Sequence, residues 1–226
     1  MNRAGASAAT REALTVLILA GGRSRRMGQD KVWMTLDGAP LIEHVVARIL
    51  PLAAEILFSA NAPERFATLA SRLPIPGRVV ADIWPGAGPL AGLHAGLLAA
   101  RHDLVLALAA DMPFVNPALI ARMVNLAQGF EAVVPQTMTE TGEPGWEPLH
   151  ALYRRSCAEA IAARLAAGDR RMLSFLADVR TRPVTPAEIA TVDPLAHSFF
   201  NINTPEDWQR ARGLAEAHAP GAQAGH

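Results

Sequence analysis

The chain has 226 residues, 50% of them hydrophobic, and its 21 Lys and Arg residues are balanced by 21 Asp and Glu residues. This composition is that of a globular protein with a sizeable core, and the balanced charge argues against a nucleic-acid coat or a polybasic membrane binder. The single cysteine, Cys157, excludes an intrachain disulfide framework and a multi-cysteine metal or iron–sulfur site. We expect it to be a small, buried or half-buried residue of a helix.

No apolar stretch is long enough to span a bilayer, and the first residues lack the long apolar segment of a secretory signal. We therefore expect a cytoplasmic protein. The composition of both ends of the chain predicts disordered tails over residues 1–13 and 217–226.

Strands and helices alternate through the first part of the chain. A short, continuously apolar run at residues 14–20 ends in a glycine pair, which is typical of a strand buried on both faces of a parallel sheet. Apolar residues at helical spacing between Pro40 and Pro51 then predict a helix. The two patterns recur in order, with strands at 55–61, 77–82, 104–113 and 131–136 and helices at 64–73, 89–101 and 116–128.

The second half of the chain is less regular. We predict a loop over 137–147, a strand that starts at Pro148 and passes into a helix over 157–168, and a further helix over 169–179. A last helix is predicted to begin after Thr204 as its cap, with Pro205 at its first position and Asp207 at its third. We expect one domain over residues 14–213, a three-layer α/β/α Rossmann-like fold with a mainly parallel, mixed sheet.

Polar residues recur where the predicted strands end. They occupy residues 21–31 after the first strand, Ser59 and Asn61 after the second, and Asp82 and Asp111 after the third and fourth. Ligands of α/β proteins bind beyond the carboxyl ends of parallel strands. Core packing does not require this pattern, so it is the first indication of a functional site.

The loop "LAGGRSRRMGQDK" at residues 19–31 follows the first strand directly. Its glycines allow tight turns, so that backbone N–H groups can surround anionic oxygens. Arg23, Arg25, Arg26 and Lys31 add positive charge, for which a triphosphate is the natural match. The loop matches neither the Walker A motif nor G-x-G-x-x-G, which argues against a P-loop enzyme and a dinucleotide-dependent oxidoreductase.

Asp111, at the end of the fourth strand, is a candidate Mg²⁺ ligand between phosphate oxygens, with a turn or helix-capping aspartate as the alternative. Asp82 is a weaker candidate of the same kind. The seven histidines lack the spacing of a zinc site. Gly88 and Gly92 in "GPLAGLHAGL" serve either helix packing or a backbone surface that reads a base edge.

Together these motifs resemble the MobA-like nucleotidyltransferases. The loop at 19–31 resembles the family signature, and "GPLAGLHAGL", "DMP", "EPLHALYRRSC", "GDRR" and "FFNINTPED" follow in the family's order. The resemblance covers residues 14–213 and implies a fold like that of the nucleotide-diphosphosugar transferases. "LAGG", Asp30-Lys31 and "NINTPED" are most similar to the molybdenum cofactor guanylyltransferases of the family, whereas its cytidylyltransferases tend towards LAAG and a Pro-Lys pair.

The resemblance implies transfer of GMP from GTP to the terminal phosphate of molybdopterin, with Mg²⁺ as cofactor and pyrophosphate as the second product. It implies that Asp111 binds Mg²⁺ and that Lys31 contacts the phosphates of the nucleotide. We expect Lys31, Asp111 and Arg26 to be the catalytic residues, with Arg26 as the first choice among the loop arginines Arg23, Arg25 and Arg26. The implied nucleotide contacts are Leu19, Ala20, Gly21, Gly22 and Asp82. Where the family has a nucleotide-contacting asparagine this chain reads "FSAN", so Ser59 or Asn61 takes that place.

We expect the N-terminal half to bind GTP and the C-terminal half to bind molybdopterin. Arg170 and Arg171 suit the phosphate of molybdopterin, and Asn201 and Asn203 offer donors and acceptors to a pterin edge. The structural alternatives are surface arginines and an asparagine that shapes the turn before the last helix.

Two other functions stay open, namely a cytidylyl- or other nucleotidyltransferase of the same family and a non-catalytic nucleotide-binding protein. Lys31 with Asp111 argues against the latter, because a sensor needs no metal-assisted leaving group. The expected partners are GTP and molybdopterin, with transient contacts to molybdenum-insertion and molybdoenzyme-maturation proteins. We expect no nucleic acid, no membrane, and a monomer or weak homo-oligomer.

Overall fold

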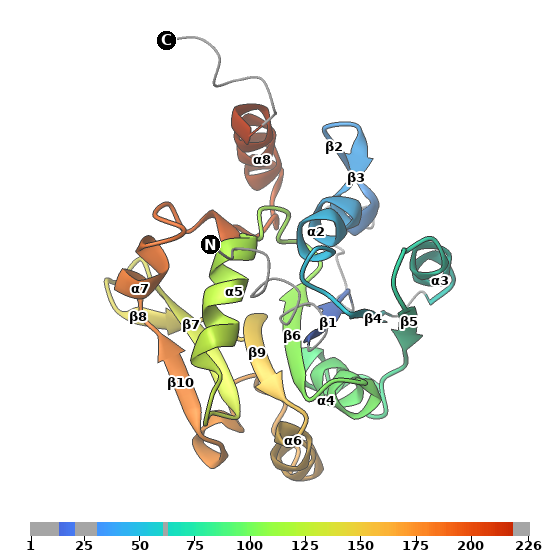
Figure 1. The fold of residues 1–226 in the computed structure, drawn as a ribbon, viewed down its shortest axis with the longest axis vertical. Helices are drawn as coiled ribbons and strands as arrows, with labels where there is room; N and C mark the ends of the chain where they lie inside the picture. The colour runs from blue at the N-terminus through green and yellow to red at the C-terminus, as the bar shows by residue number, and fades with distance from the viewer. Residues whose placement is uncertain (1–13, 21–30, 61–62, 219–226) are drawn as a thin grey trace, which may run out of the picture.

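The computed structural model describes residues 14–20, 31–60 and 63–218, and it centres on an eight-stranded sheet with helices on both faces (Figure 1). The strands are β1 (Leu14–Leu19), β4 (Glu55–Ser59), β5 (Gly77–Val80), β6 (Leu104–Ala109), β7 (Ala132–Met138), β8 (Pro144–Trp146), β9 (His150–Arg154) and β10 (Thr181–Val184). The α-helices are α2 (Leu41–Ile49), α3 (Pro63–Ser71), α4 (Pro89–Ala99), α5 (Pro117–Leu126), α6 (Cys157–Ala166), α7 (Pro186–Ala190) and α8 (Pro205–His218). A small hairpin of β2 (Thr35–Leu36) and β3 (Ala39–Pro40) lies apart from the sheet.

The strand order is β10-β7-β9-β6-β1-β4-β5, with β8 paired to β7. Along this path every pair is parallel apart from those of β9, which runs antiparallel to both β6 and β7. This arrangement confirms the predicted three-layer α/β fold with a mainly parallel, mixed sheet. It also brings the carboxyl ends of β1, β4, β5, β6 and β7 to one edge.

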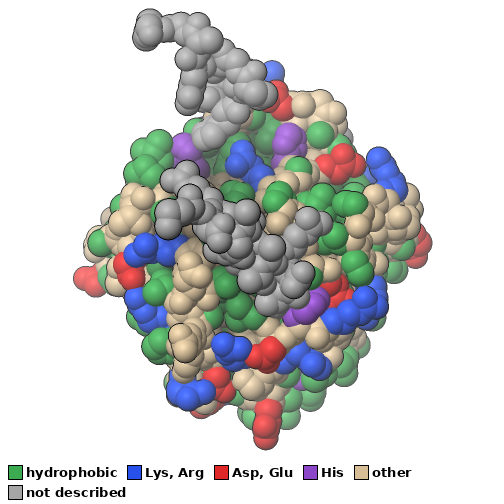
Figure 2. Space-filling view, in the orientation of Figure 1, with side chains coloured by type: hydrophobic (Ala, Val, Ile, Leu, Met, Phe, Trp, Pro, Cys, Tyr) green, Lys and Arg blue, Asp and Glu red, His purple; other side chains and the backbone are tan. Residues whose placement is uncertain are grey.

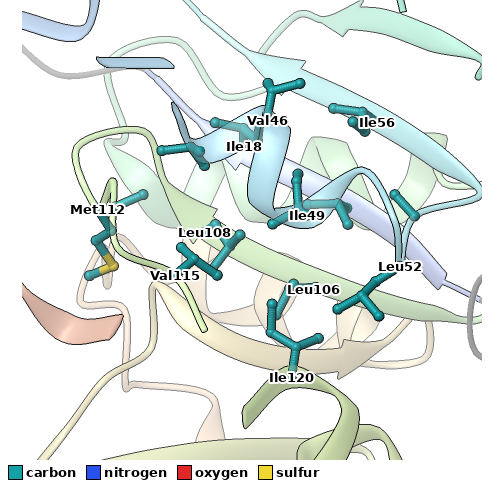
Figure 3. Close-up of a cluster of buried hydrophobic side chains, with 14 of the residues drawn as sticks. Ile18, Val46, Ile49, Leu52, Ile56, Leu106, Leu108, Met112, Val115 and Ile120 are labelled. Carbon is teal, nitrogen blue, oxygen red and sulfur yellow. The ribbon is translucent and has the colours of Figure 1, made fainter. Parts of the chain in front are cut away.

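Alternate side chains of β1 enter two different cores. Val16 and Ile18 belong to the core beneath α2, α3, α5 and α7, whereas Leu17 and Leu19 belong to the core beneath α4 and α6. Figure 3 shows part of the first core, which joins helix residues such as Ile120 to β6. Burial on both faces explains why β1 is apolar at every position except the buried Thr15.

Residues 137–147, predicted as a loop, are instead largely a hairpin. β7 continues to Met138, and β8 pairs with it in antiparallel fashion, with Gln136 opposite Trp146. The Gly-, Thr- and Glu-rich sequence hides this pairing because β8 pairs only with β7, and the paired residues are half-buried or exposed and lack the apolar pattern of a buried strand.

The helix predicted over 169–179 is also wrong, since the segment contains only the short 3₁₀ helix η3 (Leu176–Asp178). The segment begins with a turn in which the Asp169 carboxylate accepts a hydrogen bond from the backbone N–H of Arg171 at 3.1 Å. The chain then buries Phe175 against Tyr153, with ring centroids 5.6 Å apart.

The predicted cap of the last helix is confirmed. Thr204 Oγ1 accepts a hydrogen bond from the backbone N–H of Asp207 at 3.1 Å, and the Asp207 carboxylate accepts from the backbone N–H of Thr204 at 3.0 Å. A third apolar cluster joins α8 to the β2–β3 hairpin and contains Leu36, Leu41, Phe114, Ile202 and Ala211. This cluster holds the segment that leads into α8 against the β2–β3 hairpin and the start of α2.

Cys157 is buried, as predicted, and burial raises the pKa of its thiol to about 12. Figure 2 shows basic and acidic side chains interspersed over the visible face, in keeping with the balanced composition. Among the described residues no helix combines the length and the apolar character needed to cross a membrane.

His150 is the first residue of β9 and is completely buried. Neither ring nitrogen has a hydrogen-bond partner in the described part of the chain, and the ring packs on Phe199 with centroids 4.8 Å apart. Burial lowers the pKa of His150 to about 4, although the nearby Asp193 carboxylate acts in the opposite direction. His150 is therefore neutral in the folded protein at neutral pH.

This burial predicts a pH-dependent stability. As the pH falls from 6.5, the ordinary pKa of histidine, to about 4, the unfolded chain takes up a proton that the folded chain does not. The folded state should lose about 3 kcal/mol in this window relative to a His150→Leu variant. Urea unfolding of both proteins at pH 7, 5.5 and 4.5 measures the free energy of unfolding. The same pH dependence of this free energy in both proteins would contradict the prediction.

Candidate functional site

The predicted nucleotide-binding residues of the described chain gather at the carboxyl edge of the parallel strands. The backbone N–H of Ala20, just after β1, donates to the carbonyl of Ser59 at 2.8 Å, and that of Ala110 donates to the carbonyl of Leu19 at 3.2 Å. These bonds continue the strand pairing beyond the sheet and hold the ends of β4, β1 and β6 side by side. Polar groups that follow these strands therefore share one surface.

Lys31 lies at the same edge, beside the end of β6. Its ammonium donates to Asp111 Oδ2 at 2.5 Å, to the Ile202 carbonyl at 2.8 Å and to Asn203 Oδ1 at 2.9 Å. The Lys31 side chain is only 13% exposed and that of Asp111 18%. The structure thus brings together three of the predicted site residues, from both halves of the chain.

Short anchored segments hold the members of this cluster. Lys31 begins the 3₁₀ helix η2 (Lys31–Trp33), in which Val32 is buried and Trp33 packs on Phe66 with ring centroids 5.1 Å apart. Asp111 follows β6 and precedes the buried Met112. The Asp111 carbonyl accepts from the backbone N–H of Ile202 at 3.2 Å. This bond attaches the C-terminal segment directly to the end of β6.

Ser59 and Asp82 form a second pair at the same edge. Ser59 Oγ donates to Asp82 Oδ1 at 3.2 Å. A Cβ atom on Gly92 would lie 2.6 Å from Ser59 Oγ and 2.7 Å from a methyl of Leu19, so α4 approaches this pair closely only because residue 92 is glycine. The packing interpretation of Gly92 is therefore supported, while Gly88 caps α4 with φ of +78°.

The two predicted arginines have different surroundings. Arg171 pairs with Asp169 at 2.6 Å, and this hydrogen bond and charge lower the pKa of Asp169 to about 2. Arg170 instead donates to the carbonyl of Gly86 at 3.3 Å, in the loop between β5 and α4. Arg170 therefore reaches from the C-terminal half to the loop that carries Asp82.

Asn201 and Asn203 also differ. Asn203 contacts Lys31, whereas Asn201 Oδ1 is buried without a hydrogen-bond partner in the described residues. The remaining predicted site residues, Gly21, Gly22, Arg26 and Asn61, lie outside the described residues, as do Arg23, Arg25 and Gly28.

The atoms around the Lys31 ammonium suit a hard cation. A carboxylate, a backbone carbonyl and an amide oxygen are ligand types that Mg²⁺ accepts, and protein Mg²⁺ sites commonly supply only one or two carboxylates beside substrate phosphates. The described residues contain no group of three His, Cys, Asp or Glu side chains able to hold a metal by themselves. The donor set at Asp111 therefore fits a metal that also binds a phosphate ligand.

Two contributors could not be predicted from the sequence, namely the carbonyls of Ile202 and Gly86. Every residue has a backbone carbonyl, so residue type does not identify a functional one. Only a neighbouring sequence motif could indicate its role. "NINTPED" marks the neighbourhood of Ile202, but the contact to Lys31 spans 171 positions and depends on the tertiary fold.

Residues 16–183 match the model of the MobA-like NTP transferase domain. A molybdenum cofactor guanylyltransferase of Burkholderia lata is 40% identical over 204 residues, which are 88% of this chain and 94% of the relative. A probable molybdenum cofactor guanylyltransferase of Pelotomaculum thermopropionicum is 35% identical over 202 residues, 89% of this chain and 93% of the relative.

Solved structures agree with these relatives. The molybdopterin-guanine dinucleotide biosynthesis protein A of Archaeoglobus fulgidus superposes with a TM-score of 0.74 at 30% identity, covering 89% of this chain and 98% of that one. The 2-C-methyl-D-erythritol 4-phosphate cytidylyltransferase of Thermus thermophilus superposes with a TM-score of 0.64 at 22% identity, covering 91% and 99%, and shows the shared fold alone.

Proposed function

This chain belongs to the family of MobA-like NTP transferase domains and is a nucleotidyltransferase, and from that premise we propose that it is a molybdenum cofactor guanylyltransferase. It transfers GMP from GTP to the terminal phosphate of molybdopterin. The observation that carries the proposal is the contact of Lys31 with Asp111 and Asn203, because it places a cation and a carboxylate where the two halves of the chain meet.

The proposed reaction is an in-line displacement at the α-phosphorus of GTP. An oxygen of the molybdopterin phosphate forms a new bond to this phosphorus, and the bond from the α-phosphorus to the oxygen bridging to the β-phosphate breaks, so that pyrophosphate leaves. The nucleophile is already anionic, and no proton has to be removed by a general base. Catalysis then consists of aligning two anions and neutralising the charge that develops on pyrophosphate.

Lys31 and Asp111 supply this electrostatic function. Asp111 would hold Mg²⁺, which would supply positive charge to the phosphates. The Lys31 ammonium orients and neutralises the phosphates at the same place. Arg26 of the preceding loop joins them as a further phosphate contact.

The proposed sites for GTP and for molybdopterin lie on different sides of this edge. The nucleoside is surrounded by residues on neighbouring strand ends beside the start of α4, namely Leu19, Ala20, Ser59 and Asp82. Arg170, Arg171, Asn201 and Asn203 bind molybdopterin. Arg170 is the better placed of the two arginines, because its contact with Gly86 reaches from the molybdopterin side to the loop that carries Asp82 on the GTP side.

The reaction joins two small molecules and requires neither nucleic acid nor a membrane. We propose a cytoplasmic enzyme that is a monomer or weak homo-oligomer. Its contacts with molybdenum-insertion and molybdoenzyme-maturation proteins are transient.

The choice of nucleotide tests the proposal. Incubation with molybdopterin, Mg²⁺ and one of GTP, CTP or ATP should give the guanine dinucleotide at least about 10²-fold faster than either other product, because a site that hydrogen-bonds one base leaves its polar groups unpaired with another. Mass analysis of the product and release of pyrophosphate measure this. Preference for CTP would assign the chain to the cytidylyl branch, and nucleotide binding without turnover would indicate a sensor.

A further inference from the structure

Lys31 is the only lysine among the 226 residues, and the other 20 basic residues are arginines. An ammonium is a compact cation with three donors, whereas a guanidinium is a planar fork. The three oxygens around Lys31 Nζ, at 2.5, 2.8 and 2.9 Å, satisfy all three of its donors. The chain therefore uses its one compact side-chain cation where a compact cation fits a three-oxygen site.

The Lys31 ammonium stands where the proposed function requires a metal. Its shortest contact is to Asp111 Oδ2, an oxygen of the carboxylate proposed to bind Mg²⁺. Both side chains are more than four-fifths buried, so solvent screens their charges less than at the surface. A divalent cation held by the same carboxylate would repel the ammonium, and their burial leaves this repulsion poorly screened.

We propose that Lys31 is an internal cation that occupies the oxygens of the metal site in the free protein, and that a divalent cation binds to Asp111 by displacing it. The inference rests on the proposed function, in which Asp111 is the metal ligand. Displacement moves the Lys31 ammonium towards the phosphates that arrive with the metal. The same cation thus first stabilises the empty site and then neutralises the nucleotide.

Displacement also links the two halves of the site. Once Lys31 leaves, the Ile202 carbonyl and the Asn203 amide lose their common donor. The backbone there stays in place, because Ile202 is completely buried and the backbone N–H of Asn203 donates to Asp207 at 3.0 Å. The Ile202 carbonyl and Asn203 Oδ1 would then be available to the incoming metal, so the metal would draw on oxygens from both halves of the chain.

Mn²⁺ binding without nucleotide tests the displacement. Lys31→Met keeps the length of the side chain and removes its charge, so it should bind Mn²⁺ at least about tenfold more tightly than the natural protein, as measured by the loss of the free Mn²⁺ signal in electron paramagnetic resonance. Arg180→Met, which removes an exposed cation just before β10, is the matched control and should change the affinity much less. Equal Mn²⁺ affinity of Lys31→Met and the natural protein overturns the inference.

Asp111→Asn in the Lys31→Met background separates this inference from the proposed function. If the double variant loses Mn²⁺ while Lys31→Met binds no more tightly than the natural protein, Asp111 is the metal ligand and only the displacement is wrong. If the double variant still binds Mn²⁺ like Lys31→Met, the metal is elsewhere and both proposals fail. Thermal unfolding of each variant checks that the proteins are folded.

The single lysine provides a second measurement. Protein labelled with ¹³C at lysine Cε gives one side-chain lysine signal, that of Lys31. Titration with Mg²⁺ alone should shift this signal saturably in the natural protein but not in Asp111→Asn. A Lys31 signal that stays unchanged at saturating Mg²⁺ shows that the ammonium keeps its oxygens and contradicts the displacement.

Discussion

An Asp111→Asn variant is expected to lose about 10³-fold in the rate of pyrophosphate release. Asparagine keeps the size of the side chain and can still accept a hydrogen bond from Lys31, but it removes the anionic oxygen that holds Mg²⁺. GTP binding measured by calorimetry should weaken by less than about tenfold, because the other phosphate contacts are retained. The combination of lost turnover and retained binding is the signature of a group that acts on the leaving pyrophosphate.

Asp103 provides the control for this experiment. It directly precedes β6, whereas Asp111 follows it, so the two carboxylates lie at opposite edges of the sheet. Asp103 is 62% exposed and pairs with Arg154, and its change to Asn should leave the rate within about twofold. Full activity of Asp111→Asn would show that the metal role assigned to this residue is wrong.

A Lys31→Ala variant is expected to reduce turnover by about 10²-fold or more. The change removes the cation proposed to neutralise the phosphates, and it leaves Asp111, Ile202 and Asn203 without their shared donor. Lys31→Arg should restore little of the lost rate, although it restores the charge, because a planar guanidinium does not fit three converging oxygens. Steady-state rates with GTP and molybdopterin measure both variants.

Arg180→Ala is the matched control for removal of a cation. Arg180 precedes β10 at the opposite edge of the sheet, and its side chain is 72% exposed. This variant should keep its rate within about twofold, whereas an unchanged rate in Lys31→Ala would exclude Lys31 from the reaction. Recovery of Lys31→Ala by arginine to more than about half of the natural rate would show that charge alone, without compact geometry, is what the site requires.

Local patterns in the sequence predicted the layers of the fold and the edge at which the site lies. The apolar run at residues 14–20 indicates a strand buried on both faces, and the alternation of such runs with amphipathic helices predicts parallel strands. From this alone Lys31 and Asp111, 80 positions apart, were expected at one edge, and their ion pair places them there. The hairpin of β7 with β8 was not predicted because its paired residues are only half-buried or exposed and therefore lack the apolar pattern of a buried strand.

The sequence by itself therefore determined the side chains that follow each strand, because the periodicities of strands and helices are local properties of the chain. Only the tertiary structure decided what each of these side chains contacts. The packing of α8 on the β2–β3 hairpin, and the backbone bond from Ile202 to the Asp111 carbonyl, bring the Ile202 carbonyl and Asn203 to Lys31. Local patterns cannot encode these contacts, since they depend on the register and docking of distant elements.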